Sequence, residues 1–345
     1  MQKWNKPKKI GIFGNTGKIG DELVCLPAYY TIKQLYPQSS LTLLCSTSIA
    51  YNIFSNLNFI DEISTLESYK NKNGGTEFDI LLVINHNNLK ILQRAKNIPA
   101  KRKITTFSQS LMLRHGIFFI HGFERFINPY WLQTHSEVQR NLNLVRKIDP
   151  ILFDKQFPTI NLECARLQTT LTNKIYINKI LSNANSHLFE KIVGVSPFSE
   201  TSTRRKMNFE INDWLKITYI LSRKFPSFLF ILLSHSKTII SLKYQTHNII
   251  IFQNNNDLLN LVEIISRLNF LISTDTGNVH IADNLKIPVL EIISKKTKKQ
   301  WAGGAYGGFC KTMALPTNWQ KHKQKYLFKF LSLAFSCLKN LTKIS

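Results

Sequence analysis

The stretch Phe270-Leu-Ile-Ser-Thr-Asp275-Thr-Gly277-Asn-Val-His280-Ile-Ala282 passes from an apolar run through a glycine turn into a helical pattern. A short apolar run bounded by a turn predicts a buried strand at Phe270–Ser273, and the periodicity after the turn predicts a helix at Gly277–Leu285. A strand followed by a helix is the repeating unit of a parallel sheet covered by helices. The stretch therefore predicts an α/β fold.

The same alternation continues on both sides of this unit. It predicts further strands at Ile10–Phe13, Leu41–Cys45, Ile80–Ile84, Ile192–Val195, Phe228–Leu233, Ile249–Phe252 and Val289–Ile293. It predicts further helices at Asp21–Tyr36, Asn88–Ala95, Asn212–Lys224 and Asp257–Arg267.

The chain is long enough for two such domains, since it has 345 residues, of which 43% are apolar. Between the halves, Asp149–Asn161 contains two prolines and shows no clear periodicity, which is typical of a linker. We therefore predict domains at residues 1–155 and 156–345. The tail carries an apolar stripe at helical spacing, which predicts a last helix that either packs on the body or offers a basic amphipathic face to a membrane. The stripe consists of Leu327, Phe330, Leu331, Ala334 and Leu338.

The turn after Phe270–Ser273 is the strongest candidate site. Amides at the start of a helix bind anions, and Gly277 allows close approach of the backbone, so the turn suits a diphosphate. Asp275 could accept hydrogen bonds from sugar hydroxyls. His280 lies one helical turn after Thr276 and would face the same side, although a histidine at this place can also be a simple packing residue.

Two other segments follow predicted strands. Arg204, Arg205 and Lys206 come after Ile192–Val195, where they could neutralise a leaving diphosphate or form a solvated loop. The first strand leads into Gly11-Ile-Phe-Gly14-Asn-Thr-Gly17-Lys-Ile-Gly20-Asp21, which matches neither a P-loop nor the G-x-G-x-x-G fingerprint. Asp21 either caps the helix that opens there or accepts a proton from a substrate hydroxyl at the carboxyl end of the strand.

The net charge of +24, from 45 basic and 21 acidic residues, favours polyanionic partners such as a phosphorylated substrate or an anionic membrane face. Compositional drift is the alternative cause. The sequence shows no interleaving of aromatic and basic residues and no known reader motif, so nucleic acid is not the expected partner.

The five cysteines are dispersed, form no metal-ligand spacing and fit a reducing cytoplasm. We expect neither a metal nor a cofactor. The N-terminus lacks the features of a signal peptide, and no apolar run approaches the roughly 18 residues of a membrane span. These features predict a cytoplasmic protein that is soluble or peripheral.

Three motifs, in their order and separation, resemble glycosyltransferase family 9, the ADP-heptose:lipopolysaccharide heptosyltransferases. They are Gly20-Asp21-Glu-Leu-Val-Cys-Leu-Pro27-Ala28 with Leu35-Tyr36-Pro37, His135-x-Glu137-x-x-Arg140, and Asp275-Thr276-Gly277-x-x-His280 with Ile281-Ala282 and Pro288.

The resemblance implies a GT-B architecture of two Rossmann-like domains, with the last helix returning towards the first domain. It implies that Asp21 is the general base of a single inverting transfer without bound metal, from ADP-heptose to the lipid A–core acceptor at the inner face of the inner membrane. It places Asp275 on the sugar and Lys206, Thr276, Gly277 and His280 on the diphosphate. Further candidate phosphate or acceptor contacts are Lys18, Arg204, Arg205, Glu137 and Arg140.

Two loops depart from the family pattern. Ser196-Pro197-Phe198-Ser199 replaces a Pro-Gly-Ala type turn, and Ser294-Lys295-Lys296-Thr297 replaces a Gly-Pro-Thr loop. Both border the expected donor site, so a family-9 enzyme with another nucleotide-sugar donor is an alternative. A non-catalytic protein that binds saccharide or nucleic acid is a second alternative.

Overall fold

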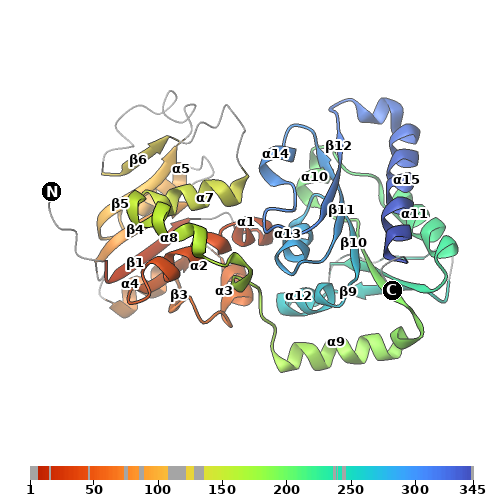
Figure 1. The fold of residues 1–345 in the computed structure, drawn as a ribbon, viewed down its shortest axis with the longest axis horizontal. Helices are drawn as coiled ribbons and strands as arrows, with labels where there is room; N and C mark the ends of the chain where they lie inside the picture. Colours follow the sequence, from red (N-terminus) through yellow and green to blue (C-terminus); the bar gives the residue numbers. More distant parts are fainter. Residues whose placement is uncertain are drawn as a thin grey trace. The chain divides into compact units, whose positions relative to one another are not determined.

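The computed structural model (Figure 1) describes residues 7–14, 17–45, 47–73, 77–84, 89–107, 122–127, 136–235, 238, 240–242 and 246–342. It divides into two compact units, Met1–Arg166 and Leu167–Ser345. Each unit contains a six-stranded sheet whose neighbouring strands are all parallel. The predicted α/β class is confirmed.

The first sheet has the strand order β3-β2-β1-β4-β5-β6. Its strands are β1 (Lys9–Gly14), β2 (Ser40–Cys45), β3 (Glu62–Thr65), β4 (Phe78–Ile84), β5 (Ala100–Phe107) and β6 (Glu124–Ile127). Its helices are α1 (Ile19–Leu23), α2 (Leu26–Leu35), α3 (Ser48–Phe54), α4 (Leu66–Asn73), α5 (Leu89–Lys96), α7 (Glu137–Arg146) and α8 (Pro150–Gln156), followed by short 3₁₀ turns at Phe157–Thr159 and Leu162–Cys164.

The second sheet has the order β12-β11-β10-β7-β8-β9. Its strands are β7 (Lys191–Ser196), β8 (Phe228–Ser234), β9 (Ile249–Gln253), β10 (Phe270–Thr274), β11 (Val289–Ser294) and β12 (Cys310–Leu315). Its helices are α9 (Leu171–Asn183), α10 (Glu200–Arg204), α11 (Ile211–Lys224), α12 (Leu258–Ser266), α13 (Gly277–Asn284), α14 (Lys298–Trp301) and α15 (Lys323–Leu341), with 3₁₀ turns at Ser186–Leu188 and Trp319–His322.

Both sheets have the same doubly wound order when their strands are counted along the chain. The chain builds one half of each sheet, returns to the centre and builds the other half, so the order reverses between β1 and β4 and again between β7 and β10. In such sheets, ligands bind outside the carboxyl ends of the strands at this switch point. The topology therefore marks one candidate location in each unit.

The predicted helix Asp21–Tyr36 is two helices. Val24 and Cys25 form a turn between α1 and α2, and Pro27 is the second residue of α2. Proline has no amide hydrogen, and its ring would collide with the carbonyl of Leu23 in a continuous helix. At the first turn of a new helix the same residue is favourable. The prediction of one continuous helix was wrong for this reason.

The segment expected as a linker is largely helical. Pro150 is the first residue of α8, and the Asp149 side chain accepts a capping hydrogen bond from the Leu152 amide at 3.0 Å. The two compact units divide between Arg166 and Leu167, whereas the sequence pattern placed the division after residue 155. A proline that begins a helix has the same local signature as one that breaks a chain, which accounts for the difference.

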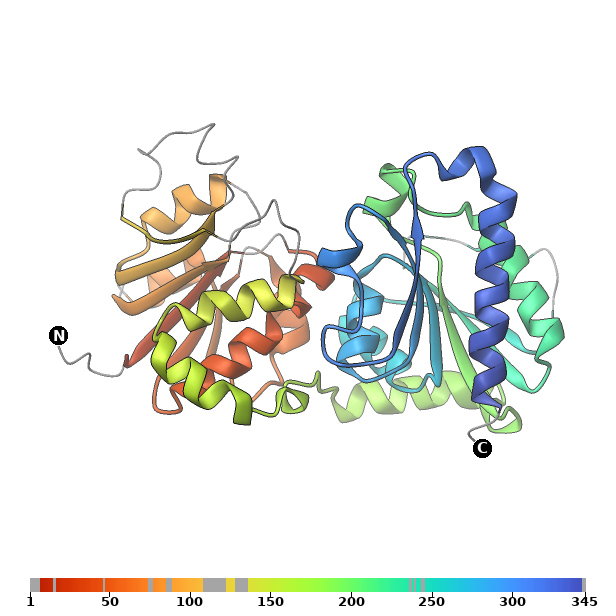
Figure 2. The same cartoon turned by 45° about the horizontal axis from the view of Figure 1, so that its top comes forward.

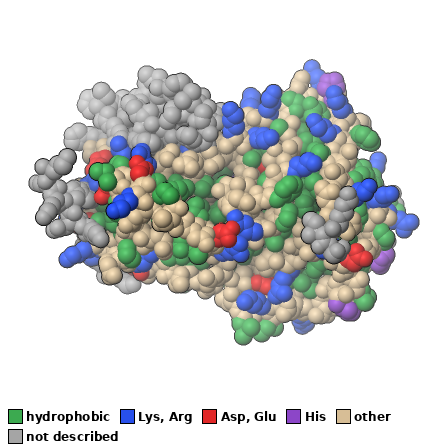
Figure 3. All heavy atoms as spheres, in the orientation of Figure 1, with side chains coloured by type: hydrophobic (Ala, Val, Ile, Leu, Met, Phe, Trp, Pro, Cys, Tyr) green, Lys and Arg blue, Asp and Glu red, His purple; other side chains and the backbone are tan. Residues whose placement is uncertain are grey.

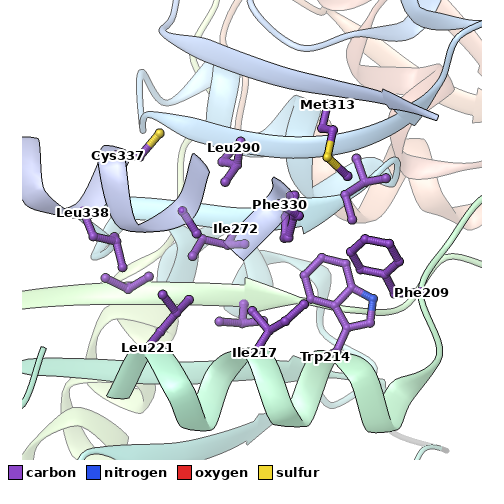
Figure 4. Packing of buried hydrophobic residues seen from close by; sticks show 14 of the residues in the cluster. Phe209, Trp214, Ile217, Leu221, Ile272, Leu290, Met313, Phe330, Cys337 and Leu338 are labelled. Carbon is purple, nitrogen blue, oxygen red and sulfur yellow. The ribbon is translucent and has the colours of Figure 1, made fainter. Parts of the chain in front are cut away.

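The core of the second unit explains the apolar stripe of the tail. Phe330, Ala334 and Leu338 of α15 are buried together with Trp214 of α11, on one face of the sheet (Figure 4). Figure 2 shows α11 and α15 along this face and α12 and α13 along the other. The stripe therefore packs the helix on the second unit, and the return of the helix towards the first domain stays a prediction.

Within the described residues, no helix combines the length and the apolar composition that crossing a bilayer requires.

Candidate functional site

The candidate donor site, comprising Asp275, Thr276, Gly277 and His280, lies at the switch point of the second sheet. The strands β10 and β7 are neighbours there, with Ser273 paired in register with Ser196. The Asn278 side-chain amide donates to the Ser196 hydroxyl at 2.8 Å, which fastens α13 to the end of β7. The Ser202 hydroxyl donates to the Asp275 carbonyl at 3.1 Å, which fastens α10 to the same turn. The structure thus brings two predicted segments to one place.

The N-terminus of α13 lacks a side-chain cap from its N-cap residue. Thr276 precedes the helix in an extended conformation and makes no side-chain capping hydrogen bond. The first turn of the helix carries no acidic residue. The first amides of a helix have no partner within the helix and lie at the positive end of its dipole. A helix end of this kind suits a phosphate group, and phosphate binding here stays a prediction.

His280 adds a second polar group to this end of α13. The side chain is only 4% exposed, and its Nδ1 atom has no hydrogen-bond partner. Burial lowers the pKa of His280 to about 4, so the ring is neutral at pH 7 and can donate one N–H. Its ring also contacts that of Trp301 edge-on, with centroids 6.3 Å apart. A buried polar atom without a partner is costly, so the packing role alone leaves Nδ1 unexplained.

The predicted basic residues lie on the surface beside this turn. Arg204, Arg205 and Lys206 are exposed at the end of α10. Lys206 has a left-handed backbone with φ of 55°, and its carbonyl accepts a hydrogen bond from the Trp319 indole at 2.8 Å. The Lys206 side chain lines a cavity of about 580 Å³ in the second unit. The other lining residues include Phe198, Asn208, Ile211, Gln320 and Lys323.

A second basic group lies in the loop that was expected to border the donor site, although its lysines were not predicted as site residues. Lys295, Lys296, Lys298 and Lys299 are exposed directly after β11, the neighbour of β10. Because the sheet order is β11-β10-β7, the turn at Asp275 lies between the two basic segments. Figure 3 shows Lys and Arg side chains along the upper part of the second unit, where Figure 1 draws α10 and α14. The run Lys-Lys-Thr-Lys-Lys was the available signal.

Two buried carboxylates behind the site were also missed. Glu291 is fully buried in β11, and its Oε2 atom has no hydrogen-bond partner. Asp283 is 1% exposed near the end of α13 and accepts hydrogen bonds from the Tyr306 and Gly308 amides. Burial raises the pKa of Asp283. A single glutamate inside the apolar run Val-Leu-Glu-Ile-Ile was the sequence signal for the first of them.

The raised pKa of Glu291 makes the free energy of unfolding depend on pH. Burial, and next the nearby charge of Asp275, raise the pKa of Glu291 to about 8. An unfolded glutamate titrates near pH ~4.3, so between there and about pH 8 only the folded chain keeps this proton. Stability therefore falls as the pH rises through this window, by roughly a few kcal/mol. We expect Glu291→Gln to gain stability relative to the wild type between about pH 5 and pH 8, measured by urea unfolding.

The comparison isolates Glu291 because His280 is present in both proteins. The lowered pKa of His280 acts in the opposite direction, removing stability as the pH falls from about 6.5 towards 4. That contribution cancels in the difference between variant and wild type. Parallel pH profiles for the two proteins would contradict the titration of Glu291.

In the first unit, Asp21 follows the switch-point strand β1. It is a half-buried residue in the first turn of α1, and Lys18 is the exposed N-cap residue of that helix. Asp21 is therefore not the N-cap residue, and what remains of its predicted structural role is a favourable interaction with the helix dipole. The Asp21 carbonyl accepts a hydrogen bond from the buried Cys25 thiol at 3.2 Å. The structure thus places Asp21 where the sequence predicted, and its catalytic role stays a prediction.

The predicted pair on α7 lies close to the same turn. Glu137 and Arg140 form an ion pair and are 1% and 8% exposed. Burial raises the pKa of the Cys25 thiol, and the charges of the nearby Glu22, Asp21 and Glu137 raise it further. Asp21, Glu137 and Arg140 therefore belong to one part of the first unit. His135 of the same motif lies outside the described residues.

No three His, Cys, Asp or Glu side chains in the described part of the chain come together as a metal site.

Two units with doubly wound parallel sheets are the components of a GT-B architecture. No family model matches the sequence, and no curated protein sequence matches it. The fold is similar to that of glycosyltransferase family 9 from Veillonella parvula, with a TM-score of 0.68, 13% identity and coverage of 91% of this chain and 88% of the other.

Two E. coli structures are also similar. ADP-heptose lps heptosyltransferase II gives a TM-score of 0.64 at 14% identity, over 89% of this chain and 90% of the other. Heptosyltransferase WaaC with ADP-2-deoxy-2-fluoro heptose gives a TM-score of 0.58 at 13% identity, over 90% of this chain and 94% of the other. The chain has the fold of these glycosyltransferases, and the fold that the sequence motifs implied is confirmed.

Proposed function

We propose that the protein is a glycosyltransferase that uses a nucleotide-sugar donor. The observation that carries this proposal is the buried, unsatisfied Nδ1 of His280 on α13, whose N-cap residue makes no side-chain cap, at the switch point of a doubly wound sheet. Amides and a neutral imidazole together suit the oxygens of a diphosphate. Solved structures with this fold include heptosyltransferases, one of them with ADP, which supports an ADP-sugar donor here.

In the proposed reaction, Asp21 takes the proton of an acceptor hydroxyl as its oxygen attacks the anomeric carbon of the donor. The bond from that carbon to the diphosphate oxygen breaks in the same step, and the configuration inverts. The leaving diphosphate carries the bonding electron pair, and the α13 amides with Lys206 hold its charge. Asp275 would accept hydrogen bonds from the sugar. Arg204, Arg205 and Lys18 are further candidates for phosphate contacts.

The expected donor is ADP-heptose and the expected acceptor is the lipid A–core saccharide. A net charge of +24 supports an anionic acceptor and a peripheral place on the anionic inner face of the membrane. A different nucleotide sugar is the second candidate, because exposed Lys295 and Lys296 stand where family 9 has a Gly-Pro-Thr loop.

Thermal unfolding with ADP, UDP, GDP and CMP, alone and as sugar conjugates, tests the donor. A ligand at about 100 times its Kd adds about 2.7 kcal/mol to the stability of the folded state. We expect ADP and ADP-heptose to stabilise the wild type, and His280→Ala to lose most of this effect because it removes a phosphate partner. Preference for another nucleotide would replace the donor, and no response to any of them would refute the proposed function.

A further inference from the structure

The glycine-rich segment Ala302–Gly308 lies against α13 and is held there by the two buried carboxylates. The Tyr306 and Gly308 amides donate to the two oxygens of Asp283 at 3.1 and 3.2 Å. The Gly303 amide donates to Oε1 of Glu291 at 3.3 Å. Each of the two side chains thus accepts backbone amides of the segment, so the path of the segment depends on both.

The fit of this segment leaves little room for another path. A Cβ atom on Gly308 would lie 2.7 Å from the Asp283 Oδ1 atom, and one on Gly303 would lie 2.8 Å from Cγ1 of Val279. Gly304 has a φ of 91°, in the left-handed region that favours glycine. The Lys286 ammonium also donates to the Tyr306 carbonyl. The segment is therefore fixed closely on α13.

The segment begins directly after Trp301. Because the segment is fixed on α13, the backbone of Trp301, and with it the position of the indole, is fixed as well. The Trp301 ring meets the His280 ring edge-on at 6.3 Å and an interplanar angle of 67°. Trp301 is half-buried, so part of the indole stays accessible, while His280 is buried with Nδ1 unsatisfied. A ligand that satisfies His280 from the start of α13 would come next to the indole.

We propose that the Trp301 indole forms a wall of the donor site, on which a ring of the nucleotide sugar packs. In this proposal Asp283 positions Trp301 by holding the glycine-rich segment that follows it. This inference rests on the proposed function. A half-buried indole offers a large, rigid face that either a nucleobase or the C–H face of a sugar can cover. Asp283 acts through the segment rather than on the ligand, because its side chain is 1% exposed and both of its oxygens accept amides of the glycine segment.

Calorimetric titration of Trp301→Ala and Trp301→Phe with ADP and with ADP-heptose tests the wall. We expect about tenfold or greater weakening for the alanine variant, and a smaller loss for phenylalanine, which keeps a ring. Weakening with both ligands identifies the nucleoside as the packed ring, because both contain it, and weakening only with ADP-heptose identifies the sugar. Phe328→Ala is the control, since this aromatic side chain is 76% exposed on α15 and should leave both affinities unchanged.

Asp283→Asn tests the positioning role. The amide nitrogen faces a backbone N–H, so at least one of the two hydrogen bonds is lost while the shape of the side chain is kept. We expect the donor KM to rise several-fold with kcat nearly unchanged. The ligand-induced change in tryptophan fluorescence should shrink in Asp283→Asn and disappear in Trp301→Phe.

Wild-type affinity in Trp301→Ala, together with weak binding in His280→Ala, would overturn this inference and leave the proposed function intact. If no nucleotide binds the wild type, both fail together. If another nucleotide stabilises the wild type more than ADP does, that nucleotide and its sugar conjugate replace ADP and ADP-heptose in the titration.

Discussion

Asp21→Asn is expected to remove most of the transfer activity while leaving donor binding unchanged. A positioned general base contributes about 10²- to 10⁴-fold to a rate, and asparagine has the same shape but cannot accept the proton. Asp21 is half-buried in the first turn of α1, where an amide keeps the packing of the helix. We therefore expect kcat to fall by about two to four orders of magnitude.

The measurement is the rate of sugar transfer at saturating donor and acceptor, beside thermal stabilisation by the nucleotide. Stabilisation should match the wild type, because apart from the further candidate Lys18 the residues proposed to hold the donor belong to the second unit. Asp154→Asn is the matched control, since it removes an exposed carboxylate of the same unit. Among the contacts described for Asp154, its only ion pair is with Arg146 on the surface. An Asp21→Asn protein with more than half of the wild-type rate would place the base elsewhere.

The role proposed for Asp21 also gives a reason for the polar interior of α7. The Asn141 side-chain amide donates to the Val24 carbonyl at 3.2 Å and contacts the Cys25 sulfur at 3.3 Å, so it braces the turn that ends α1. Glu137, one turn before it, and Arg140, directly before it, are buried as an ion pair. Breaking a buried pair leaves an uncompensated charge, which is costly. The family-like motif on α7 is thus consistent with support of the Asp21 turn rather than with direct contact to substrate.

The central strands could be predicted from the sequence because they are buried on both faces and read as continuous apolar runs. Phe228–Ser234 is the clearest case, with all seven residues buried. The missed strands β3, β6 and β12 are sheet edges, and β5 lies beside the edge strand β6. Such strands need fewer apolar residues, and Ala-Lys-Arg-Lys-Ile-Thr-Thr-Phe of β5 shows why its pattern was not recognised.

The candidate donor site could be predicted where its residues are neighbours in sequence. Asp275 to His280 form one turn and one helix start, so local patterns are sufficient. The roles of Asp283 and Glu291 depend on amides 12 to 25 residues away, which no local pattern specifies. The same holds for Trp301, whose contact with His280 follows from the path of the glycine segment.

Gly14→Ala is expected to be among the most destabilising single changes in the first unit. Gly14 ends β1 with a φ of 119° and pairs in register with Ile84 of β4. A Cβ atom there would lie 2.0 Å from the Ile84 carbonyl oxygen and 2.9 Å from its carbon, which are backbone atoms in the centre of the sheet. The two strands would have to separate at the switch point, in addition to the strain of a left-handed alanine. We expect a loss of about 3 to 5 kcal/mol.

Gly122→Ala separates these two causes. Gly122 has a similar φ of 91°, and among the described residues no atom other than those of its chain neighbours lies within 4 Å of the place of its Cβ, so backbone strain is the expected cost. Urea unfolding of both variants should give a loss of about 1 kcal/mol for Gly122→Ala and several times more for Gly14→Ala. Equal losses would show that the contact with Ile84 contributes nothing. Because the clash lies in the first unit, the nucleotide should still stabilise the second unit of Gly14→Ala under conditions where transfer activity is lost. That result would assign nucleotide binding to the second unit and a part of the transfer step to the first.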